Sequence, residues 1–330
     1  MNDTGKSLPA IPADLWALMA TVGPRWGENV PMHVQLMIDR FSEVLRAGPA
    51  HSLPVRYDIT YGAHERQMLD VYLPAPRAGA KPAVVFVHGG AFLDGNRNRS
   101  DQIYSNVLRY FACNGLVGVN VGYRLGRDAP YPGGSLDIAA AVQWVQRNSD
   151  DLGIDREQIF LMGHSAGGAH VGTYAYDRQM QPPEGHGLRG VIIVSGRVRA
   201  ETFPDNPNAA KVALYYGTSD MHQLDALSPV SHVGVHSPPT FVAWSEFENP
   251  LIDVHCVELV FRLGQAQRRT PPTFWLRGHN HMSAIAHFNT AEDALGRAIL
   301  RFITNHTDDR TTSRLSRLSA CPPASVRRTA

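Results

Sequence analysis

The sequence predicts an α/β protein in which a mostly parallel central sheet is covered by helices on both faces. Apolar runs of strand length, typical of strands buried on both faces, occupy residues 83–87, 116–121, 158–162, 190–194, 240–244 and 273–276. Helical patterns fall between most of these runs, at residues 100–113, 134–148, 165–176, 251–267 and 291–305. This alternation predicts parallel strands joined by right-handed crossovers.

Size and charge narrow the class of protein. The chain has 330 residues, of which 43% are hydrophobic, enough for one large core. Its 31 basic and 30 acidic residues leave a net charge of +1, so nucleic acid and anionic membranes are not expected as partners, and a small molecule fits better. Three widely spaced cysteines suggest no disulfide framework, which favours a cytoplasmic location. No signal peptide or membrane span is predicted, and a homodimer is compatible with the sequence.

The two ends of the chain differ from its middle. Residues 1–50 are expected to form a helical cap segment, because apolar residues recur at helical spacing before the first strand signal. Its large apolar side chains either line a substrate pocket or pack helix against helix: Trp16, Met19, Trp26, Met32 and Met37. Residues 51–307 form the expected catalytic domain, which opens with two antiparallel strands at residues 55–61 and 68–72. The arginine-rich residues 308–330 lack periodicity and are expected to be disordered.

The pentapeptide Gly163-His164-Ser165-Ala166-Gly167 stands between the strand at 158–162 and the helix at 165–176. It fits the G-x-S-x-G nucleophile elbow, in which a serine on a sharp turn needs small neighbours so that strand and helix can pass close to it. A glycine-rich turn without chemistry is the alternative. The strand before it and the helix after it favour Ser165 as a nucleophile.

A glycine pair follows the first buried strand, in His88-Gly89-Gly90-Ala91-Phe92. Glycines at the end of a strand leave backbone amides free to face a substrate oxygen. With the amide of Ala166, those of Gly89 and Gly90 would form an oxyanion hole. His88 is expected to brace this loop and not to carry a proton.

Together these motifs resemble the α/β-hydrolase fold, and within it the hormone-sensitive-lipase-like carboxylesterases and the related arylformamidases and small-ester hydrolases. The resemblance covers about residues 55–305 and also includes Gly122-Tyr123-Arg124-Leu125, Pro130-Tyr131-Pro132, Asp137, Gly168 and Ser228-Pro229. Ala91 departs from the pattern, since many members have a third glycine there.

The resemblance implies a catalytic acid after the strand at 240–244. The family pattern places it at Glu248, although this chain uses Glu where Asp is usual and inserts Asn249 before Pro250. Glu246 and Asp253 are the alternatives. Either could instead be a solvated loop carboxylate or a charge at a helix N-terminus.

The same pattern places the catalytic histidine in Gly278-His279-Asn280-His281, where Gly-x-x-His selects His281. His279 is then expected to hydrogen-bond a loop. A metal pair made by His279 and His281 is disfavoured, because no acidic or cysteine ligand clusters with them in the sequence. No metal and no cofactor are expected.

The resemblance implies a serine carboxylesterase acting on small or medium esters through an acyl-enzyme, with Ser165, His281 and Glu248 as its triad. An amide hydrolase such as an arylformamidase would use the same residues. A ligand receptor on the same fold is the remaining alternative, but such receptors generally lack a triad member.

Overall fold

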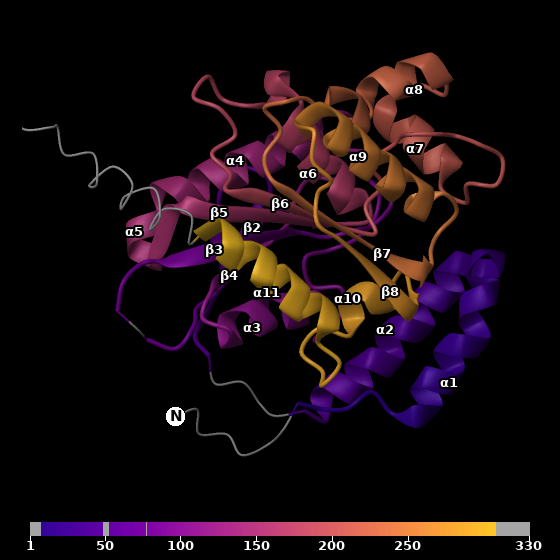
Figure 1. The fold of residues 1–330 in the computed structure, drawn as a ribbon, viewed down its shortest axis with the longest axis horizontal. Coiled ribbons are helices and arrows are strands. Elements are labelled where there is room, and N and C mark those ends of the chain that lie inside the picture. Colours follow the sequence, from indigo (N-terminus) through magenta and orange to yellow (C-terminus); the bar gives the residue numbers. More distant parts are fainter. Residues whose placement is uncertain (1–7, 49–52, 77, 308–330) are drawn as a thin grey trace, which may run out of the picture.

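Residues 8–48, 53–76 and 78–307 are described in the computed structural model, and one eight-stranded sheet runs through them in the order β1-β2-β4-β3-β5-β6-β7-β8 (Figure 1). The strands are β1 (Val55–Thr60), β2 (Met68–Tyr72), β3 (Lys81–Val87), β4 (Val117–Val121), β5 (Ile154–His164), β6 (Gly190–Val194), β7 (Thr240–Phe247) and β8 (Thr273–Asn280). Every strand expected from the sequence is present.

The first two strands run against the rest of the sheet. β1 pairs antiparallel with β2, and β2 pairs antiparallel with β4. From β4 through β3, β5, β6 and β7 to β8, each neighbouring pair is parallel. The predicted mostly parallel sheet is therefore confirmed, and the carboxyl ends of its parallel strands meet at one edge, where ligands bind in such sheets.

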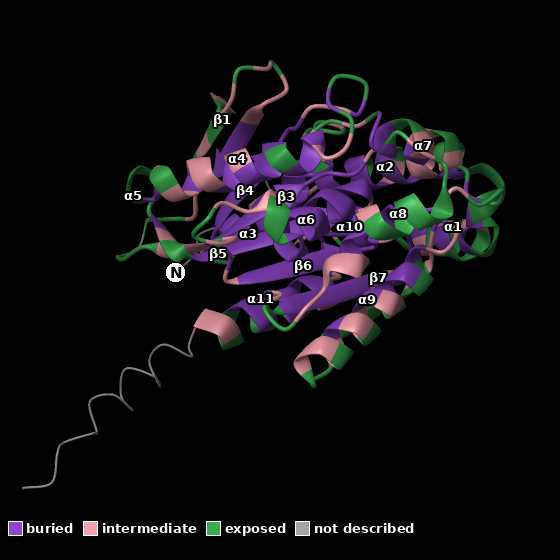
Figure 2. Ribbon diagram, turned by 90° about the horizontal axis from the view of Figure 1, so that it is seen from above, coloured by how far each residue is buried: buried purple, intermediate pink, exposed green. Residues whose placement is uncertain are grey.

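Helices cover both faces of the sheet, as predicted. Figure 1 shows α4 (Gly133–Arg147), α6 (Ala166–Tyr176) and α9 (Ile252–Gln267) above the sheet, and α3 (Ser105–Cys113) and α11 (Ala294–Thr307) below it. Two separate clusters of buried apolar residues fill these layers, and β4 and β6 between them are buried along their whole length (Figure 2). Burial on both faces explains why their sequences are unbroken apolar runs.

The N-terminal segment forms α1 (Ala13–Val22), the 3-10 helix η1 (Gly23–Asn29) and α2 (Val30–Arg46). Asn29 caps α2 by accepting a hydrogen bond from the Met32 amide at 3.2 Å, and Pro31 stands in the first turn, where its missing N–H is harmless. The segment lies beside β7, β8 and the short helix α10 (Ser283–Ala286). The predicted N-terminal helical cap is present, whereas the division into three parts at 50 and 307 stays a prediction, and residues 308–330 lie outside the described residues.

Two helices between β6 and β7 had no counterpart in the sequence prediction, and neither had the four-residue helices α5 (Ser149–Leu152) and α10. The connection from β6 to β7 contains α7 (Ala209–Tyr216) and α8 (Met221–Leu227). Both are short, and the periodicity of a two-turn helix is too brief to stand out from its surroundings. α7 packs Tyr215 against Phe92 with ring centroids 4.5 Å apart, so this connection covers the loop that follows β3.

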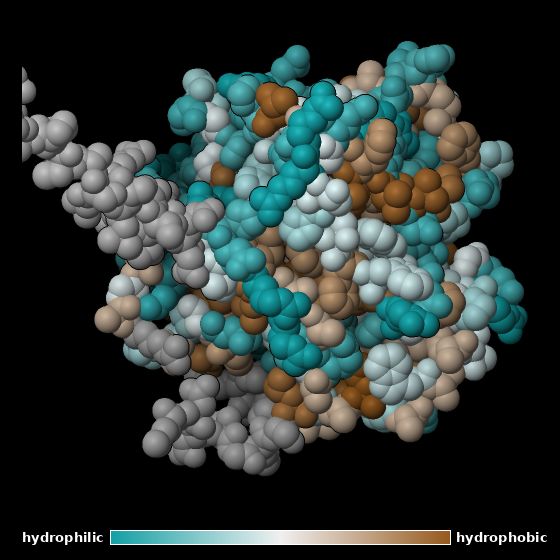
Figure 3. All heavy atoms as spheres, in the orientation of Figure 1, coloured by the Kyte–Doolittle hydropathy of each residue, from teal (hydrophilic) through white to brown (hydrophobic). Residues whose placement is uncertain are grey.

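An apolar stripe on α9 faces solvent. Val254, Val257 and Phe261 are 54%, 51% and 65% exposed, and Figure 3 shows hydrophobic side chains gathered over this helix. Among the helices of the described ranges, none has both the length and the apolar character needed to cross a bilayer.

Candidate active site

Ser165 lies on the sharp turn between β5 and α6. Its backbone angles are φ 55° and ψ −124°, a conformation that L residues adopt only at a cost of about 1–3 kcal/mol. A Cβ on Gly167 would lie 2.2 Å from the carbonyl oxygen of Val87, and one on Gly163 would lie 2.6 Å from the oxygen of Gly167. Both glycines are therefore required by close backbone approach, as the sequence prediction supposed.

His281 follows β8 and reaches this turn. Its Nε2 lies 2.9 Å from the Oγ of Ser165, although the two residues are 116 positions apart in the chain. The backbone amide of His281 donates to the Phe247 carbonyl at 2.8 Å. This bond ties the histidine to the end of β7, next to the candidate acid Glu248.

Glu248 lies on the other side of the imidazole. Its Oε2 is 2.5 Å from the Nδ1 of His281, while its Oε1 accepts from the Ser195 hydroxyl at 2.5 Å and from the Ser245 amide at 2.8 Å. The side chains of His281 and Glu248 are only 4% and 3% exposed. Because each carboxylate oxygen has its own donors, the Glu248 carboxylate is held in one orientation.

The other two candidate acids are engaged elsewhere. Glu246 accepts a hydrogen bond from the Gly278 amide at 2.7 Å, and Asp253 lies in the first turn of α9. Of the three carboxylates that the sequence left open, the structure thus brings Glu248 to the histidine. Ser195, which directly follows β6, was not predicted; its position after a buried strand next to β7 is the only signal that could have suggested it.

The predicted oxyanion loop borders the serine. A Cβ on Gly89 would lie 2.9 Å from the Cβ of Ser165, and one on Gly90, where φ is 148°, would lie 1.9 Å from the Asp94 carbonyl oxygen. Ala91 has φ 49°, so the alanine that replaces a third glycine adopts a left-handed conformation. Ala166 is the first residue of α6, which places its amide at the helix N-terminus beside Ser165.

Two buried histidines support this loop and the imidazole. The His88 Nδ1 lies 2.8 Å from the Gly89 carbonyl oxygen and its ring stacks on Tyr123 at 4.4 Å; burial lowers the pKa of His88 to about 3. The His164 Nε2 lies 3.0 Å from the carbonyl oxygen of His281. Burial and the nearby His281 hold the pKa of His164 well below its usual value, so its neutral ring donates to that oxygen. The sequence predicted the bracing position of His88 but not that of His164.

A cavity of about 400 Å³ opens onto Ser165. It is lined by Val30, Pro31 and Val34 of α2, by Met282, and by the charged residues Asp94, Arg99 and Lys211, among others. None of the five large N-terminal side chains considered from the sequence is in this lining. Met19, Trp26 and Met37 are buried in the core, Trp16 packs against it and Met32 is 53% exposed. For these residues helix packing, and not the pocket, is the role that the structure supports.

The N-terminal segment is nevertheless joined to the loop that carries the candidate acid, Glu248. The indole N–H of Trp26 donates to the Asn249 side-chain oxygen at 2.8 Å in a buried position. A Cβ on Gly23 would lie 2.2 Å from the ring of Phe247. Asn249, the insertion before Pro250 and the residue next to Glu248, therefore anchors η1 to this loop.

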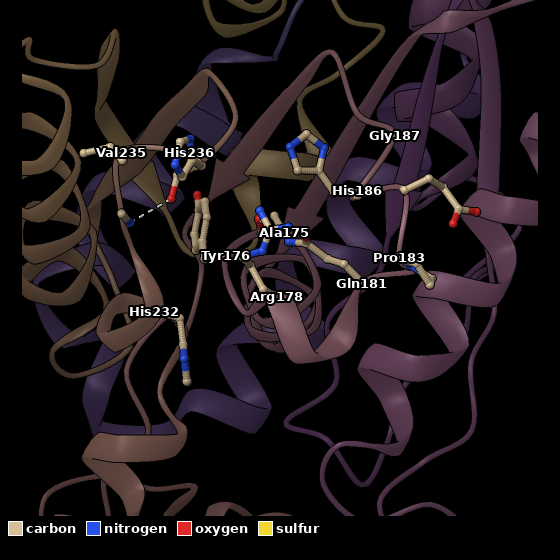
Figure 4. Close-up of a pocket in the computed structure, with 14 residues that line it drawn as sticks. Ala175, Tyr176, Arg178, Gln181, Pro183, His186, Gly187, His232, Val235 and His236 are labelled. Carbon is tan, nitrogen blue, oxygen red and sulfur yellow. Dashed lines mark hydrogen bonds between the residues drawn. The ribbon is translucent and has the colours of Figure 1, made fainter.

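A second hollow of about 410 Å³ lies away from Ser165. Figure 4 shows Tyr176, His186, His232 and His236 around it. It is bordered by residues 175–187 and 232–237 and includes neither the serine, the histidine nor the glutamate described above.

The chain was next compared with known proteins. The model of the BD-FAE family matches residues 69–259, which is more than half of the 330 residues. The chain belongs to the BD-FAE family. The match includes Ser165 and Glu248 but stops before His281 and leaves out the N-terminal helices.

Among curated relatives, the esterase LipC of Mycobacterium tuberculosis is 33% identical over 206 residues, covering 57% of this BD-FAE family member and 49% of LipC. The chain thus spans about half the length of LipC. Carboxylesterase 3 of Homo sapiens is 37% identical over 115 residues, which are 32% of this chain and 19% of that protein.

Solved structures agree on the fold. Inhibited esterase B from Lactobacillus rhamnosis matches with a TM-score of 0.69 at 19% identity, covering 90% of this chain and 99% of the esterase. A truncated carbohydrate esterase from gut microbiota matches with a TM-score of 0.65 at 19% identity, covering 78% and 99%. The predicted α/β-hydrolase fold is confirmed by these likenesses together with the sheet order.

Proposed function

We propose that this protein is a serine carboxylesterase in which Ser165 is the nucleophile, His281 the general base and acid, and Glu248 the orienting acid. The observation that carries the proposal is the unbroken series of contacts from the Ser165 Oγ through both nitrogens of His281 to Glu248, at 2.9 and 2.5 Å. All three positions that a non-catalytic receptor would tend to lose are filled, which favours an enzyme.

The mechanism follows from these contacts. His281 takes the Ser165 proton on Nε2 as Oγ attacks the acyl carbonyl, and Glu248 stabilises the imidazolium that forms. His281 then returns the proton to the departing alkoxide, which leaves an acyl group on Ser165. Water attacks that ester with His281 again as the base. The carboxylic acid product is released and the free serine is regenerated. The chemistry needs no cofactor.

Amides of Gly89, Gly90 and Ala166 are the proposed donors to the tetrahedral oxyanion. All three border Ser165: the first two line its cavity and the third begins α6. The positive end of the α6 dipole adds to their effect. Each such donor is typically worth about 3 kcal/mol of transition-state stabilisation.

We propose esters of small to medium size as substrates, because a cavity of about 400 Å³ borders the serine and pockets of this size enclose small ligands. The relatives LipC and carboxylesterase 3 carry esterase names, which supports the same class. A cytoplasmic location is part of the proposal and rests on composition alone.

A fluorophosphonate probe tests the proposal directly. It should label the wild-type protein and fail to label Ser165→Ala, with circular dichroism confirming that the variant is folded. A series of p-nitrophenyl esters of increasing acyl length, measured beside N-formyl and anilide substrates, then gives the substrate class. Turnover of the amides above that of every ester would replace the esterase with an amide hydrolase, and equal labelling of both proteins would refute the nucleophile.

A further inference from the structure

A second group of polar side chains lies close to the segment that carries His281. His279 at the end of β8, His287 after α10 and Glu292 before α11 each offer a ligand atom, and these atoms all lie within 4.8 Å of one another. His279 Nε2 is 3.6 Å from Glu292 Oε2, and His287 Nε2 is 3.2 Å from the same oxygen. Two imidazoles therefore converge on one carboxylate oxygen.

Hydrogen bonds fix which nitrogen of each ring faces the carboxylate. The His287 Nδ1 lies 2.8 Å from the Ser283 carbonyl oxygen, and a carbonyl can only accept, so this nitrogen carries the proton. The His279 Nδ1 lies 3.1 Å from the Ser283 hydroxyl, which itself donates to the Asn280 carbonyl. In their neutral forms both rings then present an unprotonated Nε2 toward Glu292.

Within the described residues the Nε2 of His287 has no hydrogen-bond partner, although its side chain is only 1% exposed. An oxygen of Glu292 lies 3.2 Å from this nitrogen but makes no hydrogen bond with it. A buried lone pair facing a carboxylate without a proton between them is unfavourable. A cation placed among the three ligand atoms of His279, His287 and Glu292 would give each of them a partner.

We propose that His279, His287 and Glu292 form a divalent metal site, best suited to Zn²⁺. Two imidazoles and one carboxylate are ligands that zinc accepts, with water as the fourth. With metal–ligand distances of 2.0–2.1 Å, neighbouring ligand atoms of a tetrahedron lie about 3.3 Å apart. The two distances to Glu292, 3.2 and 3.6 Å, are close to that value, and Glu292 is 29% exposed, which leaves a route from solvent.

The position of this site suggests its effect. His279 is two residues from His281, and Ser283, which orients both metal-binding rings, begins α10. The metal would join the end of β8 to the loop between α10 and α11 and so stabilise the segment that carries His281. This inference does not depend on the substrate or on ester hydrolysis itself. The sequence analysis did not predict this three-residue group, because His287 and Glu292 lie several residues beyond the pair His279 and His281.

The test uses the full chain without a histidine tag. After treatment with EDTA and removal of the chelator, zinc binding is measured by calorimetry and by elemental analysis, and thermal unfolding is recorded with and without ZnCl₂. The wild type should bind one equivalent and unfold at a higher temperature with zinc. Glu292→Gln, a change of similar shape at a partly exposed position, should weaken binding at least tenfold and remove the shift.

His279→Gln should behave like Glu292→Gln. The matched control is His232→Gln, because His232 also lies near a carboxylate, that of Asp177 at 3.9 Å, but is not part of the three-ligand group. Cobalt bound to the wild type should give the visible bands of tetrahedral coordination, and these bands should be absent from Glu292→Gln. Zinc binding of equal strength in wild type and Glu292→Gln would overturn the proposal, as would the absence of a bound equivalent in the wild type.

Discussion

Replacing Glu248 by glutamine should change the tautomer of His281. The Ser195 hydroxyl and the Ser245 amide both donate to Oε1 of Glu248, at 2.5 and 2.8 Å. A glutamine at this position must keep its carbonyl oxygen there, which turns its NH₂ group toward the Nδ1 of His281. Two donors cannot face each other at the 2.5 Å that now separates these atoms, so Nδ1 gives up its proton and Nε2 becomes the protonated nitrogen. Nε2 then cannot accept the proton of Ser165.

The size of the effect follows from what is lost. In a serine protease, the equivalent change from a carboxylate to an amide lowers kcat by about 10⁴ through the wrong tautomer. We expect a fall in kcat of roughly 10³ to 10⁴, equivalent to about 4–5 kcal/mol of transition-state stabilisation, with KM little changed because the side chain does not touch substrate. Glu248→Asp is shorter by one methylene and cannot hold all three hydrogen bonds, so it should lose about 10²-fold.

The assay is steady-state hydrolysis of a p-nitrophenyl ester, compared at matched thermal stability. Glu246→Gln and Asp253→Asn are the controls, since Glu246 bonds the Gly278 amide and Asp253 lies in the first turn of α9; both should keep kcat within a few-fold. Near-normal kcat in Glu248→Gln, together with a collapse in Asp253→Asn, would refute the assignment.

Three further outcomes are expected. Ser165→Ala and His281→Ala should each abolish turnover to a similar extent, because the triad acts as a unit; retained activity in either folded variant argues against it. Trp26→Phe leaves a buried amide oxygen without its donor and should lower the free energy of unfolding by about 1–3 kcal/mol in urea titrations, whereas an unchanged midpoint would mean that this bond contributes nothing. Burial lowers the pKa of His88 and of His170 to about 3, so the unfolded chain takes up protons below about pH 6.5 that the folded chain does not. The free energy of unfolding should therefore fall as the pH drops from about 6.5 toward 3, by roughly 2 kcal/mol for each histidine at pH 5. The variant His170→Gln should show a weaker dependence of this free energy on pH. Urea midpoints that stay constant between pH 7.5 and pH 5 would contradict the prediction.

The residue types along the sequence were sufficient to predict the fold and the sharp turn at Ser165, the proposed nucleophile. Strands buried on both faces must be apolar throughout, so runs such as residues 83–87 and 190–194 were visible without a structure. The turn at Ser165 needs glycine on both sides, because a Cβ on Gly167 would meet the Val87 carbonyl oxygen at 2.2 Å. Requirements of this kind are imposed by the backbone and appear directly in the residue types.

Only the tertiary structure decided which distant side chains meet. Glu246, Glu248 and Asp253 are all carboxylates close in sequence, yet it is Glu248 that the pairing of β7 with β8 brings to 2.5 Å from His281. Ser195 reaches Glu248 from another strand, and His287 and Glu292 reach His279 across a helix and a loop. These contacts cannot be predicted from spacing along the chain. Parallel strands that are far apart in sequence end at the same edge of the sheet, and their loops converge there.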